Sequence, residues 1–450
     1  MFPSSWQSRE RNNKNLANGK ESARSLSGGV MTSLGGGNLD GRNLYSRDCE
    51  GPFMETIVHL NQVLDPSRTG REAETLETNL RKHIVGQEEA VQQIVNIYQM
   101  HLTGMNPPGR PIGNFLFLGP TGTGKTRIVE ATAESMLNNP RAVIKIDCAE
   151  FQHSHEIAKL IGSPPGYLGH RETHPLLSQE TINQFHTEKV KISFVLFDEI
   201  EKASDSLWNL LLGILDKATL TLGDNRKVDF SKAMIFMTSN LGASEMSSLL
   251  APRLGFGLSS SKTIQQGEAL DEKMTAKINR SGVEAARKKF TPEFMNRLDK
   301  IVVFKPLAES DIRRILDIEL RMIQNRIFQS LGERSFVFTV TEASKNFLLQ
   351  EGVDLKYGAR HLKRALERLI VQPMSNLMAT EQVIAGDWLR IDHEEDQKQL
   401  IFLKEAEGMS INAMAHITDQ SIVHLANAIS ASAGAFEAVR VPAARTTRRG

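Results

Sequence analysis

From residue 53 onward, stretches in which apolar residues recur every three or four positions alternate with short, almost continuous apolar runs. The first pattern is typical of amphipathic helices and predicts them over 53–64, 76–84, 90–98 and 309–331. The second pattern is typical of strands buried on both faces of a parallel sheet. Such strands are expected at 115–118, 142–146, 194–197 and 234–237.

The predicted strands alternate with helical stretches, which favours a doubly wound parallel α/β sheet that binds its ligands at the C-terminal ends of the strands. The residues around 220–230 predict a hairpin, and the polar segment 259–279 is expected to be mobile. A smaller α+β domain should follow. Its predicted parts are a strand at 336–340, two helices around 357–377 and a hairpin formed by 387–391 and 400–403.

These patterns divide the chain into four parts. Residues 1–51 are polar and rich in glycine, and we expect them to form a disordered tail because they cannot bury enough apolar surface. A large domain over 52–306 and a small domain over 307–404 follow. The remainder, 405–450, is expected to be disordered apart from one short amphipathic helix.

Composition narrows the class of protein. The chain has 450 residues, with 54 Lys and Arg against 53 Asp and Glu, and this near-neutral balance favours neither nucleic acid nor an anionic membrane as a partner. The two cysteines provide no disulfide framework and suit a reducing compartment. Because no apolar run approaches the roughly 18 residues of a membrane span, we predict a soluble cytoplasmic protein.

A glycine-rich turn between the first predicted strand and the next helix carries the clearest chemistry. Its glycines let successive backbone N–H groups face a phosphate, and the helix N-terminus adds a positive dipole end. The lysine is expected to reach the β- and γ-phosphates of ATP, and the following threonine hydroxyl to ligate Mg²⁺. The residues of this predicted phosphate loop are Gly119, Pro120, Thr121, Gly122, Thr123, Gly124, Lys125 and Thr126.

Two acidic residues end the strand at 194–197, where a nucleotide hydrolase needs carboxylates beside Mg²⁺. Asp198 is expected to hold the ion, and Glu199 to polarise the attacking water as general base. Asn240 ends the next buried strand and could orient that water, although asparagine is also common in turns. A solvated strand end is the alternative for the two acids.

Seven motifs, in order, resemble those of the Clp-type AAA+ unfoldases, most closely the second ATPase domain of ClpB and ClpA. The resemblance covers about residues 76–403 and implies an AAA+ P-loop NTPase fold with a small C-terminal domain. The motifs are Ile84-Val85-Gly86-Gln87, the phosphate loop, the 162–169 run Gly-Ser-Pro-Pro-Gly-Tyr-Leu-Gly, the 197–203 run Phe-Asp-Glu-Ile-Glu-Lys-Ala, the 238–242 run Thr-Ser-Asn-Leu-Gly, the 290–299 run Phe-Thr-Pro-Glu-Phe-Met-Asn-Arg-Leu-Asp, and Tyr357-Gly358-Ala359-Arg360.

The resemblance implies a homohexamer with each ATP at a subunit interface. Ile84 and Val85 would flank the adenine, and Asn240 would sense the γ-phosphate. Arg297 would be an arginine finger that reaches the neighbouring subunit's ATP, and Arg360 would be a second sensor on the small domain. Without the motif context, each arginine would be interpreted as a surface ion-pair partner.

The resemblance also implies a pore loop at 166–169, in which Tyr167 and Leu168 would grip a translocating polypeptide. A ring on a glycine-hinged loop provides contact area for any sequence. The alternative is a tyrosine packed on the domain surface. Leu254-Gly255-Phe256 resembles the tripeptide with which related ATPases dock on the ClpP peptidase, although a local apolar anchor would also explain it.

The sequence departs from the family in having one ATPase domain where ClpB has two, and a longer stretch after Gly169. That stretch carries His170 and His174, which with His153 and His155 could suggest a metal site. Loop polarity is the better interpretation, because no cysteine or acidic residue accompanies them at ligand spacing.

Three functions compete. The leading hypothesis is an ATP-dependent protein unfoldase or remodelling chaperone that threads polypeptide through a hexameric pore. A second is the ATPase subunit of a ClpP-like protease. A third, from another class, is an AAA+ motor acting on nucleic acid, which the near-neutral charge and Tyr167 disfavour.

Overall fold

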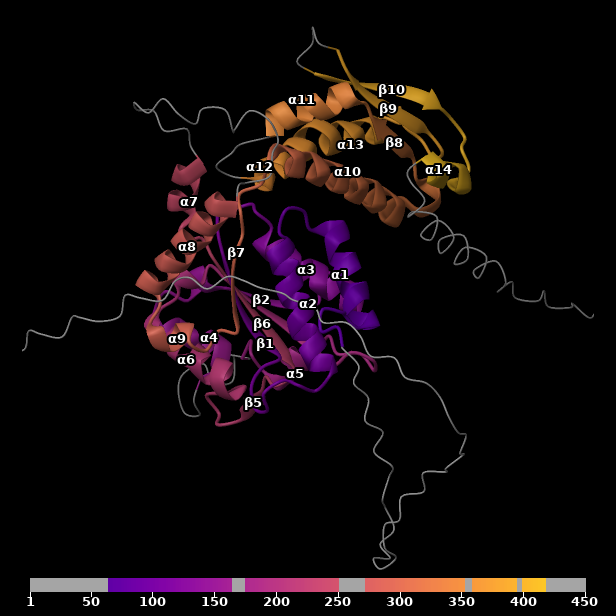
Figure 1. The fold of residues 1–450 in the computed structure, drawn as a ribbon. Coiled ribbons are helices and arrows are strands. Elements are labelled where there is room, and N and C mark those ends of the chain that lie inside the picture. The colour runs from indigo at the N-terminus through magenta and orange to yellow at the C-terminus, as the bar shows by residue number, and fades with distance from the viewer. Residues whose placement is uncertain (1–63, 164–174, 251–271, 353–357, 395–398, 418–450) are drawn as a thin grey trace, which may run out of the picture. The chain divides into compact units, whose positions relative to one another are not determined.

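The computed structural model describes residues 64–163, 175–250, 272–352, 358–394 and 399–417. The helices and strands given below all belong to one compact unit, Pro66–Gly450. They build a five-stranded sheet with helices on both faces, followed by a smaller domain around a three-stranded sheet (Figure 1). None of the described helices is long and apolar enough to cross a membrane.

The larger sheet is parallel throughout and has the strand order β2-β3-β6-β1-β7. Because β1 lies inside the sheet and later strands are added on both sides of it, the chain winds in both directions, and the predicted doubly wound fold is confirmed. The strands are β1 (Gly113–Leu118), β2 (Val143–Asp147), β3 (Ser193–Asp198), β6 (Ala233–Ser239) and β7 (Lys300–Val303).

Alternate side chains of each strand pack on opposite faces of this sheet. Phe115 and Phe117 belong to an apolar core with α1 (Arg71–His83), α2 (Glu88–Leu102) and α3 (Lys125–Leu137). The alternate residues of β1 belong to a second core on the other face. The helices that contribute to it are α4 (Ala158–Ile161), α5 (Gln179–Asn183), α6 (Asp205–Lys217), α7 (Ala243–Leu250), α8 (Glu272–Lys289) and α9 (Pro292–Met295).

One part of the sequence prediction is wrong here. Residues 272–279 were expected to belong to a mobile polar segment, but they form the first half of α8. The reason is that Ile278 and Ala286, on one face of this otherwise polar helix, are buried in the second core. The short strand β7 was also not predicted, because its four residues carry too little pattern by themselves and are held by pairing with β1.

The predicted hairpin is present as β4 (Thr219–Thr221) and β5 (Lys227–Asp229). Only the central residue of each strand is buried, so the hairpin is anchored to the second core by Leu220 and Val228.

The C-terminal domain has its own apolar core and a mixed sheet in the order β10-β9-β8. Strand β9 pairs in parallel with β8 and antiparallel with β10. Between α12 and α13 the helix continues through a π-helical turn, so the two predicted helices form one continuous helical stretch. The elements are α10 (Glu309–Leu331), β8 (Val337–Val340), α11 (Glu342–Gly352), α12 (Ala359–Leu366), α13 (Gln372–Ala379), β9 (Trp388–His393) and β10 (Leu400–Ala406).

Ordered structure continues past residue 404, where the small domain was expected to end. β10 extends to Ala406, and α14 (Ile411–Ile417) packs Met414 against Phe328 and Val337. One short helix was expected in the C-terminal segment without a position, and α14 is the helix that the described part of this segment contains.

Candidate active site

The predicted phosphate loop connects the C-terminal end of β1 to the N-terminus of α3. Gly119 has φ 138°, and a Cβ there would lie 2.5 Å from the carbonyl oxygen of Phe304, so only glycine fits. Gly124 has φ 100° and directly precedes Lys125, the first residue of α3. The N–H groups at the start of α3 therefore face the pocket lined by the loop, as an anion site requires.

Lys125 crosses this loop instead of extending into solvent. Its Nζ donates to the carbonyl oxygens of Gly119 at 2.6 Å and Pro120 at 2.9 Å, and to Oδ1 of Asn240 at 2.9 Å. These are neutral acceptors, and an anionic oxygen in their place would form stronger, charge-assisted hydrogen bonds. The amine is thus held where a bound phosphate would compete for it.

Burial lowers the pKa of Lys125 to about 8, although the carboxylates of Glu201 and Asp198 act in the opposite direction. The cause is loss of hydration of the ammonium group, which favours the neutral amine. A dianionic or trianionic ligand beside this amine would restore its proton affinity.

Asp198 is the last residue of β3 and lies at the edge of the same pocket. Its Oδ1 accepts a hydrogen bond from the Thr238 hydroxyl on the neighbouring strand β6. Its Oδ2 forms an ion pair with Lys145 Nζ at 3.4 Å. Both contacts orient the carboxylate.

Glu199 follows in the left-handed region, with φ 57°, which is uncommon for a residue with a side chain. Its backbone N–H donates to Thr238 Oγ1 at 3.1 Å. One carboxylate oxygen lies 2.5 Å from Lys202 Nζ, and the other accepts from Asn240 Nδ2 at 3.3 Å. Strained backbone of this kind persists only where the surroundings hold it, often at functional sites.

Asn240 connects the lysine and the glutamate. Its amide oxygen accepts from Lys125, and its amide nitrogen donates to Glu199. Its backbone N–H donates to Glu201 Oε1 at 3.2 Å, which fixes the strand end. The structure therefore brings the predicted phosphate loop, acids and asparagine into one cluster.

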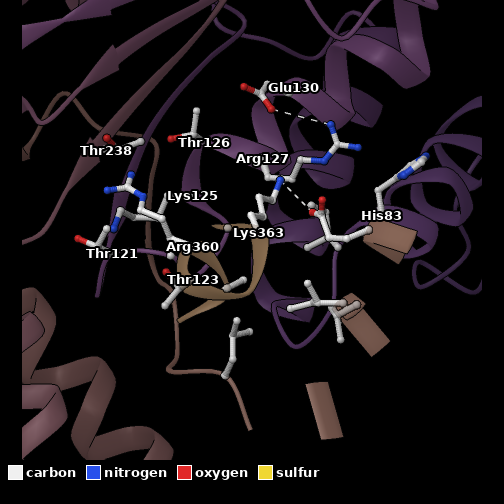
Figure 2. Close-up of a pocket in the computed structure, with 18 of the residues that line it drawn as sticks. His83, Thr121, Thr123, Lys125, Thr126, Arg127, Glu130, Thr238, Arg360 and Lys363 are labelled. Carbon is white, nitrogen blue, oxygen red and sulfur yellow. Dashed lines mark ion pairs between the residues drawn. The ribbon is translucent and has the colours of Figure 1, made fainter. Parts of the chain in front are cut away.

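The pocket has a volume of about 280 Å³ and extends from the phosphate loop to an apolar end. Ile84 and Val85 line that end, each 5% exposed. His83 stands there too, at the far side of the pocket from Lys125 in Figure 2. Burial lowers the pKa of His83, so its imidazole is neutral at pH 7. The C-terminal domain completes this end with Leu307, Ile315 and Ile318.

Helix α12 of the C-terminal domain closes the pocket beside the phosphate loop. The backbone N–H of Ala359 donates to the carbonyl oxygen of Gly122 at 3.2 Å. Arg360 lies next to Lys125 in Figure 2 and forms no ion pair with any residue that the structure describes. One turn on, Lys363 is neutralised by Glu319 at 2.8 Å. Arg360 is thus a cation of this pocket available to a ligand.

Arg297 does not line the pocket. It lies between α9 and β7, at the edge of the sheet where the parallel strands begin, whereas the phosphate loop lies where they end. β1 has six residues and spans about 20 Å. The guanidinium donates to the Leu212 carbonyl oxygen at 3.2 Å and pairs with Glu293 at 3.0 Å and Asp216 at 3.7 Å. Arg297 cannot serve the pocket of its own chain.

The residues present fit a nucleotide with Mg²⁺. The hydroxyl of Thr126 and the carboxylate of Asp198 line the pocket and are the oxygen ligands that Mg²⁺ prefers. Lys125, Arg360 and the N-terminus of α3 supply positive charge and N–H donors for phosphates, and the apolar end of the pocket suits a nucleotide base.

Sequence reasoning missed three residues that shape the acidic cluster. Thr238 bonds both Asp198 and Glu199, while Lys145 and Lys202 each pair with one of them. Thr238 is the penultimate residue of the buried strand β6, two residues before Asn240, and a polar residue at that place was the available signal. Lys145 left no comparable signal, because its pairing with Asp198 is set by the register of β2 and β3, whereas Lys202 pairs within the turn, three residues after Glu199.

Four sets of predicted residues lie wholly or partly outside the described part of the chain: the helix expected at 53–64, the pore loop, the histidines and the tripeptide. Tyr167, Leu168, His170 and His174 fall within 164–174, and Leu254-Gly255-Phe256 falls within 251–271. His153 and His155 are described, and their rings stack at 5.7 Å.

Two family models match the chain. Residues 110–301 match an AAA domain (Cdc48 subfamily), and residues 307–391 match the C-terminal, D2-small domain of ClpB protein. The first covers the phosphate loop and acidic cluster, and the second covers most of the domain that carries Arg360.

Similar curated proteins are ATP-dependent Clp protease ATP-binding subunits ClpC. The protein of Staphylococcus saprophyticus is 37% identical over 322 residues, and that of Staphylococcus aureus 38% over 323 residues. Each alignment covers 71% of this chain and 36% of the relative. The chain thus spans little more than a third of the length of these relatives.

Among solved structures, two Hsp104 complexes share the fold. They are a closed-state cryo-EM reconstruction of Hsp104 with ATPγS and FITC-casein, and a Saccharomyces cerevisiae Hsp104–casein complex in an extended conformation. Each is 28% identical with a TM-score of 0.60, and the match covers 74% of this chain and 52% of the other.

Proposed function

The chain belongs to the Clp-type AAA+ family, and on that premise we propose that it hydrolyses ATP in order to unfold or remodel other proteins. We assign the large ATPase domain to 52–306, a small domain to the residues that begin at 307 and include β10 and α14, and the protein to the cytoplasm. The relatives are named as ATP-binding subunits of a protease, and this name supports ATP as the nucleotide and a protein as the substrate. The relatives are much longer than this chain, which spans 36% of each.

One observation carries the proposal. The phosphate loop, the two acids and Asn240 meet in one pocket with Arg360 of the small domain, while Arg297 lies at the opposite edge of the sheet. A site that is complete apart from its arginine finger requires a second subunit. We therefore propose a homohexamer in which Arg297 serves the neighbouring subunit's ATP.

Hydrolysis in this arrangement begins with an exchange of partners. Lys125 would leave the carbonyls of Gly119 and Pro120 for phosphate oxygens, a stronger, charge-assisted interaction. Glu199 would release Lys202 and take the proton of the attacking water, which Asn240 orients. Mg²⁺ held by Thr126 and Asp198 would neutralise the developing phosphate charge.

The sensor arginine would couple this chemistry to motion. Arg360 is on a helix that already contacts the phosphate loop through Ala359 and Gly122. A γ-phosphate that attracts the guanidinium would draw α12 toward the loop, and its loss would release the helix. Rotation of the small domain then follows the nucleotide state.

The polypeptide substrate would be gripped by Tyr167 and Leu168. Tyr167→Ala is expected to leave ATP affinity and basal hydrolysis within a few-fold of the unmodified protein, because the nucleotide pocket is unchanged. Unfolding should fail, because alanine offers too little contact area to hold a chain under load. The measurement is ATP-dependent loss of fluorescence from a tagged, stably folded reporter, with ATPase rates measured in parallel.

Tyr167→Phe is the matched control and should retain most unfolding activity, since the grip depends on the ring. Unfolding that survives Tyr167→Ala would contradict the threading mechanism. Loss of ATPase activity in step with unfolding would assign Tyr167 a structural role. Stimulation of the ATPase by DNA would favour a nucleic-acid motor instead.

A second candidate function is the ATPase subunit of a ClpP-like protease. It is favoured by the names of the ClpC relatives and by Leu254-Gly255-Phe256. Adding a ClpP-type peptidase should then convert unfolding of the reporter into its degradation. Substitution of Phe256 by alanine should abolish degradation and spare unfolding.

A further inference from the structure

The turn that carries Glu199 is anchored by an indole. Trp208, in the first turn of α6, donates its Nε1–H to the carbonyl oxygen of Ile200 at 3.1 Å. Ile200 directly follows the left-handed Glu199 and is fully buried. The hydrogen bond therefore holds the strained turn from the apolar core in which Ile200 is buried.

The same ring begins a run of aromatic contacts that leads to Arg297. Trp208 meets Phe290 edge-on at 5.5 Å, and Phe290 stacks on Phe294 at 5.2 Å. Both phenylalanines are almost fully buried. The backbone N–H of Arg297 donates to the carbonyl oxygen of Phe294 at 3.1 Å. Packed rings at these distances transmit displacement because the core cannot be compressed.

The C-terminal half of α6 holds the arginine side chain itself. The guanidinium of Arg297 donates to the Leu212 carbonyl oxygen and pairs with Asp216. From Trp208 to Asp216 the helix rises about 12 Å, at 1.5 Å per residue. One rigid helix therefore contacts the Glu199 turn near its beginning and Arg297 near its end.

We propose that α6 is a strut that fixes Glu199 and Arg297 relative to each other, with Trp208 as its positioning residue. The inference rests on the proposed function, in which Glu199 serves the ATP of its own subunit and Arg297 that of the next. A shift of the Glu199 turn on loss of the γ-phosphate then moves the arginine finger, so one site controls the next one around the ring.

The first test separates the indole hydrogen bond from ring packing. Trp208→Phe keeps an aromatic ring against Phe290 and loses the N–H bond to Ile200. We expect kcat for ATP to fall about 5- to 10-fold, the scale of one lost hydrogen bond, with KM within about twofold. Trp388→Phe is the matched control, because it removes an indole bond of 3.2 Å to Thr339 in the small domain and should leave kcat unchanged.

The second test examines each end of the strut separately. When Glu199→Gln and Arg297→Ala subunits are mixed, only one kind of interface is productive. In it, the Arg297→Ala subunit supplies the intact Glu199, and the Glu199→Gln subunit supplies the intact Arg297. Placing Trp208→Phe in the Arg297→Ala subunit reports on Glu199, and placing it in the Glu199→Gln subunit reports on Arg297. We expect turnover to fall about 5-fold in both mixtures.

Unchanged turnover in either mixture, with co-assembly verified, would overturn the two-ended strut. A reference mixture without Trp208→Phe that shows no turnover would count against the shared-interface function instead.

The strut can also be tested without nucleotide. In a Trp6→Phe, Trp388→Phe background, Trp208 is the sole tryptophan, and Arg297→Ala should change its emission maximum. Arg326→Ala, which removes an ion pair to Glu367 in the small domain, should not. Identical spectra in Arg297→Ala would refute the coupling.

Discussion

At the scale of single residues, the state of Lys125 decides whether phosphate can bind. The amine is 8% exposed and bonded to neutral oxygens, and its pKa is lowered to about 8 by burial. Below pH 8 the group is cationic and attracts phosphate. Above pH 8 it loses its proton in the free protein, and a bound nucleotide must first restore it.

We therefore predict that ATP affinity falls as pH rises above about 8, by up to tenfold per pH unit. Lys125→Arg keeps its charge throughout this range and should bind more weakly but with a flat pH profile. Lys125→Ala should lose ATP binding, because the phosphates lose their main counter-ion. Titration of a fluorescent ATP analogue between about pH 7 and 9.5 measures all three. A flat profile in the unmodified protein would contradict the role given to burial.

The carboxylate of Glu199 is held in place by two neighbouring side chains and is positioned to act as a general base. This carboxylate pairs with Lys202 and accepts a hydrogen bond from Asn240. Glu199→Gln should bind ATP normally and hydrolyse it at least ~100-fold more slowly, because the amide cannot take the proton. Single-turnover hydrolysis together with nucleotide binding checks this, and near-normal turnover would exclude Glu199 as the base.

At the scale of elements, the approach of α12 to the phosphate loop depends on a glycine. Gly358 has φ 54°, and a Cβ there would lie 2.8 Å from the carbonyl oxygen of Gly122. The contact brings Arg360 into the pocket, so the glycine sets the distance between the small domain and the phosphates.

Gly358→Ala should weaken ATP binding several-fold and lower stability by about 1–3 kcal/mol, the cost of a strained backbone. Gly332 is the matched control, with φ 55° but nothing within 4 Å of its added Cβ. Gly332→Ala should show a similar loss of stability with unchanged nucleotide affinity. Equal affinities in the two variants would mean that α12 does not need the close approach.

At the scale of the whole molecule, the proposed role of Arg297 depends on where its side chain lies. Its guanidinium is held by Leu212, Glu293 and Asp216, about a strand length from the pocket of its own chain. An arginine finger removed from its own site and presented on a fixed support suits action in trans.

Arg297→Ala is expected to keep ATP affinity and lose hydrolysis by roughly 10³-fold or more. Mixed with Glu199→Gln subunits, it should regain turnover at interfaces that pair an intact glutamate with an intact arginine. Steady-state ATPase activity of the mixture, with co-assembly measured in parallel, gives the answer. Turnover equal to the sum of the separate variants would reject the shared interface.

Much of this was determined by the sequence itself. The phosphate loop, Asp198, Glu199 and Asn240 were predicted because each follows a buried strand, and the C-terminal ends of parallel strands meet at one edge of a sheet. The helix expected at about 309–331 is present as α10, since its apolar periodicity is long. Local pattern suffices where the buried face of an element repeats over several turns, as in α10.

Only the tertiary structure decided the rest. α8 and β7 are too polar or too short to be predicted locally, and they form because the second core and β1 supply partners. The bond from Lys125 to Asn240 and the separation of Arg297 from its own pocket arise from residues far apart in the chain, and the bond from Trp208 to Ile200 depends on how the turn after β3 packs on α6. Burial, strand register and long-range hydrogen bonds depend on how distant parts of the chain pack together, so the spacing of residues in the sequence does not predict them.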